Sequence, residues 1–245
     1  MKARQAIGIA AVALTAAILA TVSATGPRAS AHAAQTARPN ILVLETDDQT
    51  LAEMEVLPQV RRLIGDEGVT FDNNFDSFSL CCPSRASLLT GQYSHNNGVR
   101  GNALPDGGYY KLDSTNTLAV WLKNAGYYTV HLGKYLNGYG TRNRTEIPPG
   151  WSEWHSPIGA DTYHYYGYTL NENGTLRRYD DTYQTDQFTQ EAVSLVRSRA
   201  ASDRPFFMWL TYLAPHVGSP AGAPGAGRQH VPLTPLPATR HVGKY

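Results

Sequence analysis

The chain has 245 residues, and its 21 basic and 20 acidic side chains give a formal net charge of +1 at pH 7. This balance, without any long basic run, gives no basis for nucleic-acid binding, so we exclude that class of partner. Only two cysteines are present, so stability must come from a buried core rather than from disulfides. About 210 residues outside a leader are enough for one domain with such a core.

The first 33 residues have the composition of a secretory leader. A short basic head is followed by an apolar run from Ala6 to about Val22 and then by small residues that end at Ala33. This pattern predicts a signal peptide over residues 1–33, a secreted protein and no stable membrane association. An uncleaved membrane anchor is the alternative, because the apolar run approaches the length that spans a bilayer.

A short apolar run, residues 41–44, lies between a proline-containing segment and a polar one. Its pattern predicts a strand buried on both faces, as in a parallel sheet with helices on either side. Asp47 and Asp48 follow its carboxyl end, where ligands bind in open α/β sheets. Adjacent carboxylates repel each other unless a cation is near, so they indicate half of a Ca²⁺ or Mg²⁺ site; a solvated turn is the alternative.

Residues 57–68 have apolar positions at helical spacing and end in glycine, which predicts a short amphipathic helix. We expect this helix to lead into a strand near Val69 to Phe75.

The stretch from Ser79 to Gly91 contains both cysteines, side by side. Neighbouring residues form a disulfide only with strain, so a structural bridge is not expected. Pro83 suits the first turn of a helix and Gly91 suits its end. Cys81 would then lie at the positive end of a helix with Arg85 one turn later, an environment that favours thiolate or a sulfate-like anion. The alternative is a buried reduced pair of thiols.

A second helix, Leu118 to Ala125, is predicted with Trp121 and Leu122 as core contacts. It precedes a second apolar strand, residues 127–132, which ends at Gly133 and Lys134. The ammonium group of a lysine at this position could donate hydrogen bonds to a bound anion. We interpret His131, inside the strand, as structural.

Residues 138–185 are rich in aromatic side chains and contain a β-hairpin that turns at Asn173 and Gly174. Its aromatic rings are expected to pack on the domain, with a sugar-facing surface as the alternative.

Residues 186–201 form the clearest amphipathic helix, and a third apolar strand over 205–213 ends near His216. Three strands thus each end in a reactive group, which predicts one shared pocket in an α/β fold. Residues 218–245 are rich in proline and glycine and are expected to form loop or disorder.

The motif Cys81-x-Pro83-Ser84-Arg85, followed by Leu88-Leu89-Thr90-Gly91, resembles the signature of the type I sulfatases. In that family the first cysteine is oxidised to formylglycine, so the resemblance implies that a formylglycine-generating enzyme modifies Cys81. Cys82 then occupies the variable position of the motif.

The resemblance also implies the roles of other residues. Asp47, Asp48 and the modified Cys81 would bind Ca²⁺, with Mg²⁺ as the alternative. Cys81, Arg85, Lys134 and His216 would be catalytic. The form Gly133-Lys134-Tyr135-Leu136-Asn137, in place of the Trp-His that follows Gly-Lys in many members, looks like that of the N-acetylglucosamine-6-sulfatases.

The likeness implies an alkaline phosphatase/sulfatase-like fold: a mostly parallel sheet between helices, incomplete at its C-terminal side. Residues 38–217 match only the first part of the catalytic domain, because the family's further metal and sulfate ligands come from a later segment.

The implied function is hydrolysis of O-sulfate esters of sugars, of the glucosamine 6-sulfate type, in degradation of sulfated glycosaminoglycans. The alternatives are an arylsulfatase or phosphonate hydrolase of the same superfamily and a non-catalytic binder of sulfated glycans.

Overall fold

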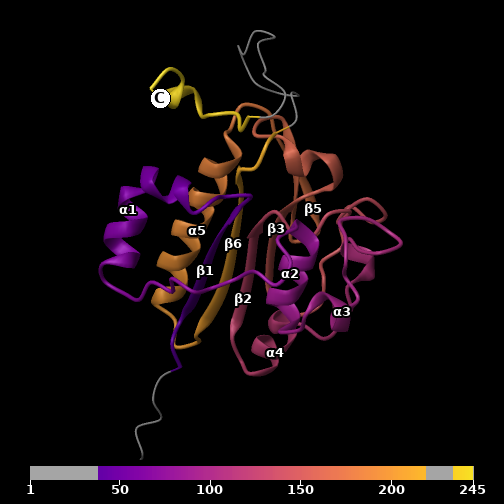
Figure 1. Cartoon of the computed structure of the whole chain (residues 1–245). Helices are drawn as coiled ribbons and strands as arrows, with labels where there is room; N and C mark the ends of the chain where they lie inside the picture. Colours follow the sequence, from indigo (N-terminus) through magenta and orange to yellow (C-terminus); the bar gives the residue numbers. More distant parts are fainter. Residues whose placement is uncertain (1–37, 219–233, 245) are drawn as a thin grey trace, which may run out of the picture. The chain divides into compact units, whose positions relative to one another are not determined.

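A six-stranded sheet lies at the centre of the described residues, 38–218 and 234–244, in the computed structural model (Figure 1). The strand order is β1-β6-β2-β3-β4-β5; the first four strands in this order run parallel, and β4 and β5 are antiparallel additions. This confirms the predicted α/β class. The strands are β1 Ile41–Asp47, β2 Tyr128–Gly133, β3 Glu153–Pro157, β4 Tyr168–Glu172, β5 Thr175–Tyr179 and β6 Phe206–Pro215.

Helices lie between most of these strands along the chain. Their bounds are η1 Ala52–Val56, α1 Pro58–Val60, η2 Arg61–Gly65, α2 Cys81–Thr90, α3 Ser94–Asn97, η3 Tyr109–Lys111, α4 Leu118–Asn124, η4 Gly159–Tyr163, α5 Gln184–Ala200 and η5 Thr239–His241. The predicted leader, residues 1–33, lies outside the described residues, as do residues 219–233 of the predicted C-terminal loop.

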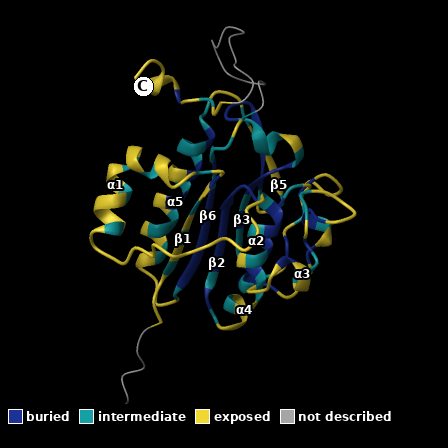
Figure 2. Cartoon of the chain, in the orientation of Figure 1, coloured by how far each residue is buried: buried dark blue, intermediate teal, exposed yellow. Residues whose placement is uncertain are grey.

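β6 is buried on both faces, as its apolar run predicted. Phe206, Met208 and Leu210 pack in one cluster with residues of α5. Phe207 and Trp209 point to the other face and pack in a cluster with residues of α2 and α4. Figure 2 shows β6 and β2 largely in the colour of buried residues, whereas α1 is mostly exposed. The helices therefore cover the central strands from both sides.

β1 differs from its prediction because it is the outermost strand of the sheet. Ile41 and Val43 pack against the cluster on the α2 side. Leu42 and Leu44 point the other way and remain 46% and 48% exposed. The prediction of burial on both faces is wrong for β1, since α5 packs against β6 and β2 rather than over the edge strand.

The segment after β1 also departs from expectation. The helix predicted over 57–68 is present as α1 and η2, which follow each other without a break from Pro58 to Gly65, but no strand forms over 69–75. Phe71 and Phe75 are 78% and 83% exposed. The polar residues 72–74 separate these two rings, and residues of this type favour turns over paired strands.

The other predicted helices are present with small shifts at their ends. α2 ends at Gly91, whose φ of 64° is the left-handed conformation expected of a C-terminal glycine. α4 is followed by Gly126 with a φ of 91°. The prediction that Trp121 is a core contact is wrong. Its side chain is 42% exposed, and its Nε1 donates a hydrogen bond to Asn116 Oδ1 at 2.8 Å.

The predicted hairpin joins β4 and β5 through Asn173 and Gly174, both with positive φ, as a tight two-residue turn requires. Most aromatic side chains of this region are buried, so the packing interpretation is correct for Trp151, Trp154, Tyr165, Tyr166 and Tyr168. Tyr163 is an exception, since it is only half-buried. His131 is fully buried, with its ring centroid 4.5 Å from that of Trp154, and is structural as predicted.

We expect Phe188→Ala to lower the free energy of unfolding by about 3–5 kcal/mol, because Phe188 is completely buried between α5 and the sheet. Val193→Ala on the same helix is the control; this side chain is 43% exposed, so the change should stay within about 1 kcal/mol. Urea unfolding followed by circular dichroism measures both, and equal losses would contradict the described packing of α5.

Candidate active site

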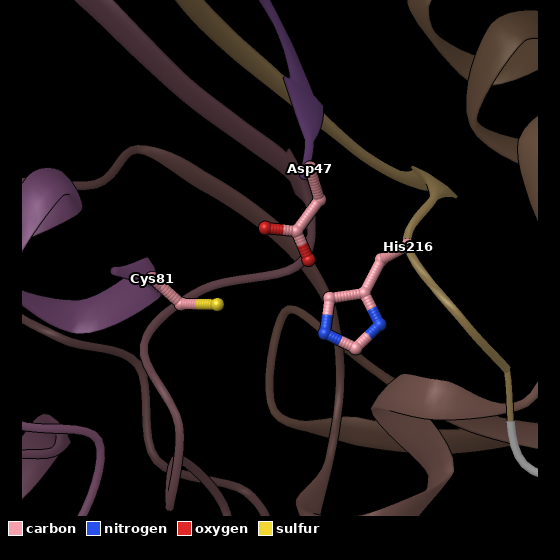
Figure 3. Close-up of side chains that lie close together, drawn as sticks. All are labelled: Asp47, Cys81 and His216. Carbon is pink, nitrogen blue, oxygen red and sulfur yellow. The ribbon is translucent and has the colours of Figure 1, made fainter. Parts of the chain in front are cut away.

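Three neighbouring strands bring reactive side chains to one edge of the sheet. Asp47 is the last residue of β1, Lys134 follows β2, and His216 follows β6. Cys81 reaches the same place from the first residue of α2. One ligand atom each from Asp47, Cys81 and His216 lie within 4.8 Å of one another, and Figure 3 shows the three side chains converging. The structure thus brings together the groups predicted to share a pocket.

Lys134 reaches this site because the chain passes unusually close to β6 at Gly133. A Cβ atom on Gly133 would stand 1.8 Å from the carbonyl oxygen of Thr211, and its φ of 104° is also unfavourable for other residues. Glycine therefore allows the backbone N–H of Lys134 to donate to the same Thr211 oxygen at 2.9 Å. The lysine side chain then enters the interior, where it is fully buried.

Asp47 lies between two buried cations. Its Oδ2 accepts a hydrogen bond from Lys134 Nζ, and its Oδ1 is 3.3 Å from Arg85 Nη2. Arg85 also stands 3.1 Å from Glu45 Oε1 and donates to the backbone oxygen of Lys134 at 2.6 Å. Burial lowers the pKa of Lys134, but the charge of Asp47, together with the smaller effects of Tyr163 and Cys81, outweighs it, so the pKa of Lys134 lies above its ordinary value. Lys134 is therefore protonated at neutral pH.

Cys81 faces these charges from the start of a ten-residue helix. Its Sγ is 3.5 Å from Lys134 Nζ, and it is a hydrogen-bond partner of His216. That hydrogen bond raises the pKa of His216 above its ordinary value, against the opposing effect of partial burial. The helix N-terminus adds positive potential at the same point. An anion bound next to Cys81 would be stabilised by all of these groups.

Cys82 occupies a different environment although it is the next residue. It is fully buried, its Sγ accepts a hydrogen bond from the backbone N–H of Asn137 at 3.1 Å, and its own N–H donates to Asn102 Oδ1 at 2.9 Å. Burial raises the pKa of the Cys82 thiol to about 11. Cys82 therefore anchors the start of α2, whereas Cys81 opens toward the pocket.

Asp48 lies at the outer edge of the cluster of Asp47, Cys81 and His216 and contacts it through His216. Its φ of 59° turns the chain, and its side chain is 59% exposed, with Oδ2 3.4 Å from His216 Nε2. Aspartate is one of the few residues other than glycine that adopts this conformation readily. Of the three predicted metal ligands, the structure places Asp47 beside Cys81, while Asp48 contacts His216 instead.

A pocket of about 320 Å³ opens beside Cys81 and Arg85. Four carboxylates are among the side chains that line it, contributed by Glu45, Asp47, Asp48 and Asp76. Hard cations such as Ca²⁺ and Mg²⁺ prefer oxygen ligands of this kind. The chemistry of the donors therefore fits a divalent cation.

Two residues at this site were not predicted to lie there. Glu45 could have been found, because it lies two positions before Asp47 in the same strand and so shares its face. Tyr163, at the end of η4, belongs to the aromatic region 138–185, for which a sugar-facing surface was the alternative, but nothing in the sequence assigned it to this site. Its ring centroid is 4.9 Å from Lys134 Nζ and 5.2 Å from the His216 ring, and its hydroxyl accepts a hydrogen bond from Asn137 Nδ2 at 2.6 Å.

The fold and this site define a class of protein. An open, mostly parallel sheet flanked by helices, with its reactive groups at the carboxyl ends of the strands, has the fold of the alkaline phosphatase-like α/β proteins. The Sulfatase family model matches residues 39–235. The chain belongs to the sulfatase family, which confirms the resemblance carried by the cysteine motif.

Individual relatives agree with this assignment. The chain is 38% identical to N-acetylglucosamine-6-sulfatase of Homo sapiens over 197 residues, which are 75% of this chain and 35% of that protein. It is 35% identical to the extracellular sulfatase SULF-1 homolog of Drosophila melanogaster, over 76% of this chain and 17% of that protein.

A solved structure, that of BT4656 in complex with its substrate D-glucosamine-2-N,6-O-disulfate, is similar with a TM-score of 0.61 and 31% identity. The match covers 73% of this chain and 35% of that one. The chain thus spans 35% or less of the length of these relatives.

We expect Asp47→Asn to lower the free energy of unfolding by about 3–5 kcal/mol, since it leaves the buried Lys134 without its counter-charge and Arg85 with Glu45 alone. Asp48→Asn is the matched control and should cost less than about 1 kcal/mol, because its carboxylate is largely exposed. Chemical unfolding with chelator present separates this effect from metal binding. Similar losses for the two variants would mean that the charge network is not a main source of stability.

In protein that retains both thiols, iodoacetamide at pH 8 should label Cys81 and leave Cys82 largely unmodified. Cys82 is buried, and with a pKa of about 11 it forms thiolate only at much higher pH. Both cysteines lie in the tryptic peptide of residues 63–85, so tandem mass spectrometry can assign the label. Preferential labelling of Cys82 would be inconsistent with the described packing at the start of α2.

Proposed function

We propose that this chain forms the amino-terminal part of a formylglycine-dependent sulfatase that hydrolyses O-sulfate esters of sugars. The observation that carries the proposal is the position of Cys81. It lies at the start of α2, 3.5 Å from the Lys134 ammonium, and is hydrogen-bonded to His216 beside Asp47. The position combines a modifiable side chain with the charges that a sulfate ester requires.

Electrostatics supports a sulfate substrate at this place. A sulfate monoester carries a negative charge that repels most nucleophiles, so its hydrolysis needs fixed positive groups around the sulfuryl oxygens. Arg85 and Lys134 are held by their hydrogen bonds to Asp47 and to the backbone, so they would need little rearrangement when the substrate binds. The helix dipole at the start of α2 adds positive potential for the same anion.

Formylglycine at position 81 would supply, as its hydrate, a hydroxyl nucleophile and a second hydroxyl that allows the sulfated adduct to release sulfate. The chain's own residues orient and protonate this centre. Lys134 stands next to the position 81 side chain, and a ring nitrogen of His216 lies within 4.8 Å of the Cys81 Sγ position, where it could donate a proton to the leaving oxygen.

A divalent cation, Ca²⁺ or alternatively Mg²⁺, would neutralise sulfuryl charge as a Lewis acid. Asp47, Asp48 and the modified Cys81 are the proposed ligands, and the carboxylates lining the pocket supply suitable oxygen donors. Hard cations of this class take six or more ligands, so oxygens from outside the described residues are part of the proposal.

The proposed substrate is a glucosamine 6-sulfate unit in a sulfated glycan. Its support is the similarity to a named N-acetylglucosamine-6-sulfatase and to a solved protein bound to a 6-O-sulfated glucosamine, together with the form of residues 133–137. We also propose secretion, because the relatives include a protein named as an extracellular sulfatase. None of the helices in the described ranges is long and apolar enough to cross a membrane.

The test begins with Cys81. When the chain is produced together with a formylglycine-generating enzyme, the peptide of residues 63–85 should lose about 18 Da, the difference between cysteine and formylglycine. The longest protein expressed from the gene should release sulfate from glucosamine 6-sulfate, and Cys81→Ala should lower kcat/KM at least about a thousandfold by removing the nucleophile.

Cys82→Ala is the control, because its side chain points away from the pocket; conversion at position 81 should persist in this variant. Conversion without release of sulfate from any sugar or aryl ester would reject the enzyme assignment. An intact thiol combined with binding to sulfated glycans would instead favour the non-catalytic binder.

A further inference from the structure

A second cluster of titratable side chains lies on the α5 side of the sheet, outside the pocket around Cys81. His155 of β3 stands between two carboxylates: its Nε2 is 3.1 Å from Glu153 Oε1, and its Nδ1 is 3.3 Å from Glu191 Oε2 of α5. Glu172 of β4 completes the group. One ligand atom each from His155, Glu172 and Glu191 lie within 4.8 Å of one another.

The carboxylates of this cluster are held in place by neighbours. Hydrogen bonds run from Tyr128 to Glu153 Oε2 at 2.6 Å, from Gln187 to Glu191 Oε1 at 2.6 Å, and from Tyr179 to Glu172 Oε1. For Glu153 and Glu191 the donor occupies one carboxylate oxygen, and the other oxygen faces His155. Donors of this kind orient the ligands in metal sites of proteins.

Two facing atoms at the centre of the cluster form an ion pair without a hydrogen bond. His155 Nδ1 and Glu191 Oε2 stand 3.3 Å apart, each exposes less than 1 Å², and neither makes a hydrogen bond to any described residue. Buried polar atoms usually make hydrogen bonds, so a cation that bonds to both would complete this pair.

The charges of the cluster are unbalanced in the same direction. Three carboxylates surround one imidazole; Arg177 contacts Glu172 at 3.3 Å but is 64% exposed, and Arg199 acts on Glu153 only through its charge. Burial raises the pKa of Glu191; the charge of His155 and the hydrogen bond from Gln187 oppose this effect, and the charges of Glu172 and Glu153 add to it, so the pKa lies above its ordinary value. The pKa of His155 is raised too: burial lowers it, but the three carboxylates outweigh that effect. A protonated His155 offsets only one of the three carboxylates, and the remaining positive charge comes from Arg177, which is largely exposed, and from Arg199, which makes no ion pair with them.

We propose that His155, Glu172 and Glu191 form a divalent-cation site of the Zn²⁺ class, with Glu153 beside it, separate from the site around Cys81. Imidazole nitrogen and carboxylate oxygen are ordinary Zn²⁺ donors. Ligand atoms about 2.1 Å from a tetrahedral Zn²⁺ stand about 3.4 Å apart. The His155 and Glu191 atoms already have this separation, and Glu172 needs only a small approach. The bound cation would join β3, β4 and α5.

The experiment compares Zn²⁺ stoichiometry of the chelator-treated chain with that of His155→Gln and Glu191→Gln, by calorimetry and elemental analysis. His164→Gln is the matched control, since His164 pairs with Asp161 at 3.5 Å with similar exposure but has no part in the cluster. The parent and the control should bind one more Zn²⁺ than the other two variants. Any Zn²⁺ bound near Cys81 contributes equally to the stoichiometry of all four proteins, so it does not affect the difference between them.

Thermal unfolding gives a second readout. At a Zn²⁺ concentration about a hundredfold above its Kd, the Tm of the parent should rise by about 5 °C or more relative to His155→Gln. Equal stoichiometry and equal Tm shifts in parent and variants would overturn the proposal and leave a histidine–carboxylate ion-pair network.

If circular dichroism shows that both variants fail to fold, Co²⁺ decides with the parent alone. After Cys81 is alkylated, Co²⁺ bound by nitrogen and oxygen ligands should give visible absorption bands. The absence of these bands would reject the site. Every readout is metal binding rather than catalysis, so the result is independent of the proposed sulfatase activity.

Discussion

The site depends on one buried ionic contact, that of the Asp47 carboxylate with Lys134 and Arg85. Three charges removed from water are tolerable only when they compensate one another and their remaining donors are bonded. Glu45 and the backbone oxygen of Lys134 meet this condition for Arg85. The contact connects β1, α2 and the end of β2, so the same interaction that stabilises the sheet edge also fixes the positive groups beside Cys81.

Adjacent residues acquire opposite roles through this arrangement. Cys81 faces the charges at the start of α2, whereas Cys82 is enclosed by Asn102 and Asn137 and its pKa is raised by burial. Asp47 is likewise enclosed, while Asp48 turns out toward solvent. In the cysteine pair at the start of α2 and in the aspartate pair at the end of β1, the backbone directs one side chain into the core and the other toward the pocket or the solvent. The two residues of each pair are nevertheless chemically alike.

Much of this could be predicted because the signals were local. The apolar run of β6 and the glycines that end α2 and α4 each determine structure over a few residues, and the convergence of Asp47, Lys134 and His216 follows from parallel strands. The features that the sequence did not predict depend on tertiary contacts. An apolar run does not reveal that β1 is an edge, and nothing near Tyr163 in the sequence shows that η4 returns to Lys134.

The alternating exposure of β1 has a consequence for handling the isolated chain. Among the described residues no strand pairs with the outer edge of β1, and Leu42 and Leu44 present apolar surface beside its free backbone groups. Such an edge is a template for another extended segment, because it offers hydrogen bonds and hydrophobic burial together. Concentrated solutions of this chain should therefore be prone to intermolecular strand pairing, and a charged residue at position 42 or 44 would be the simplest way to oppose it.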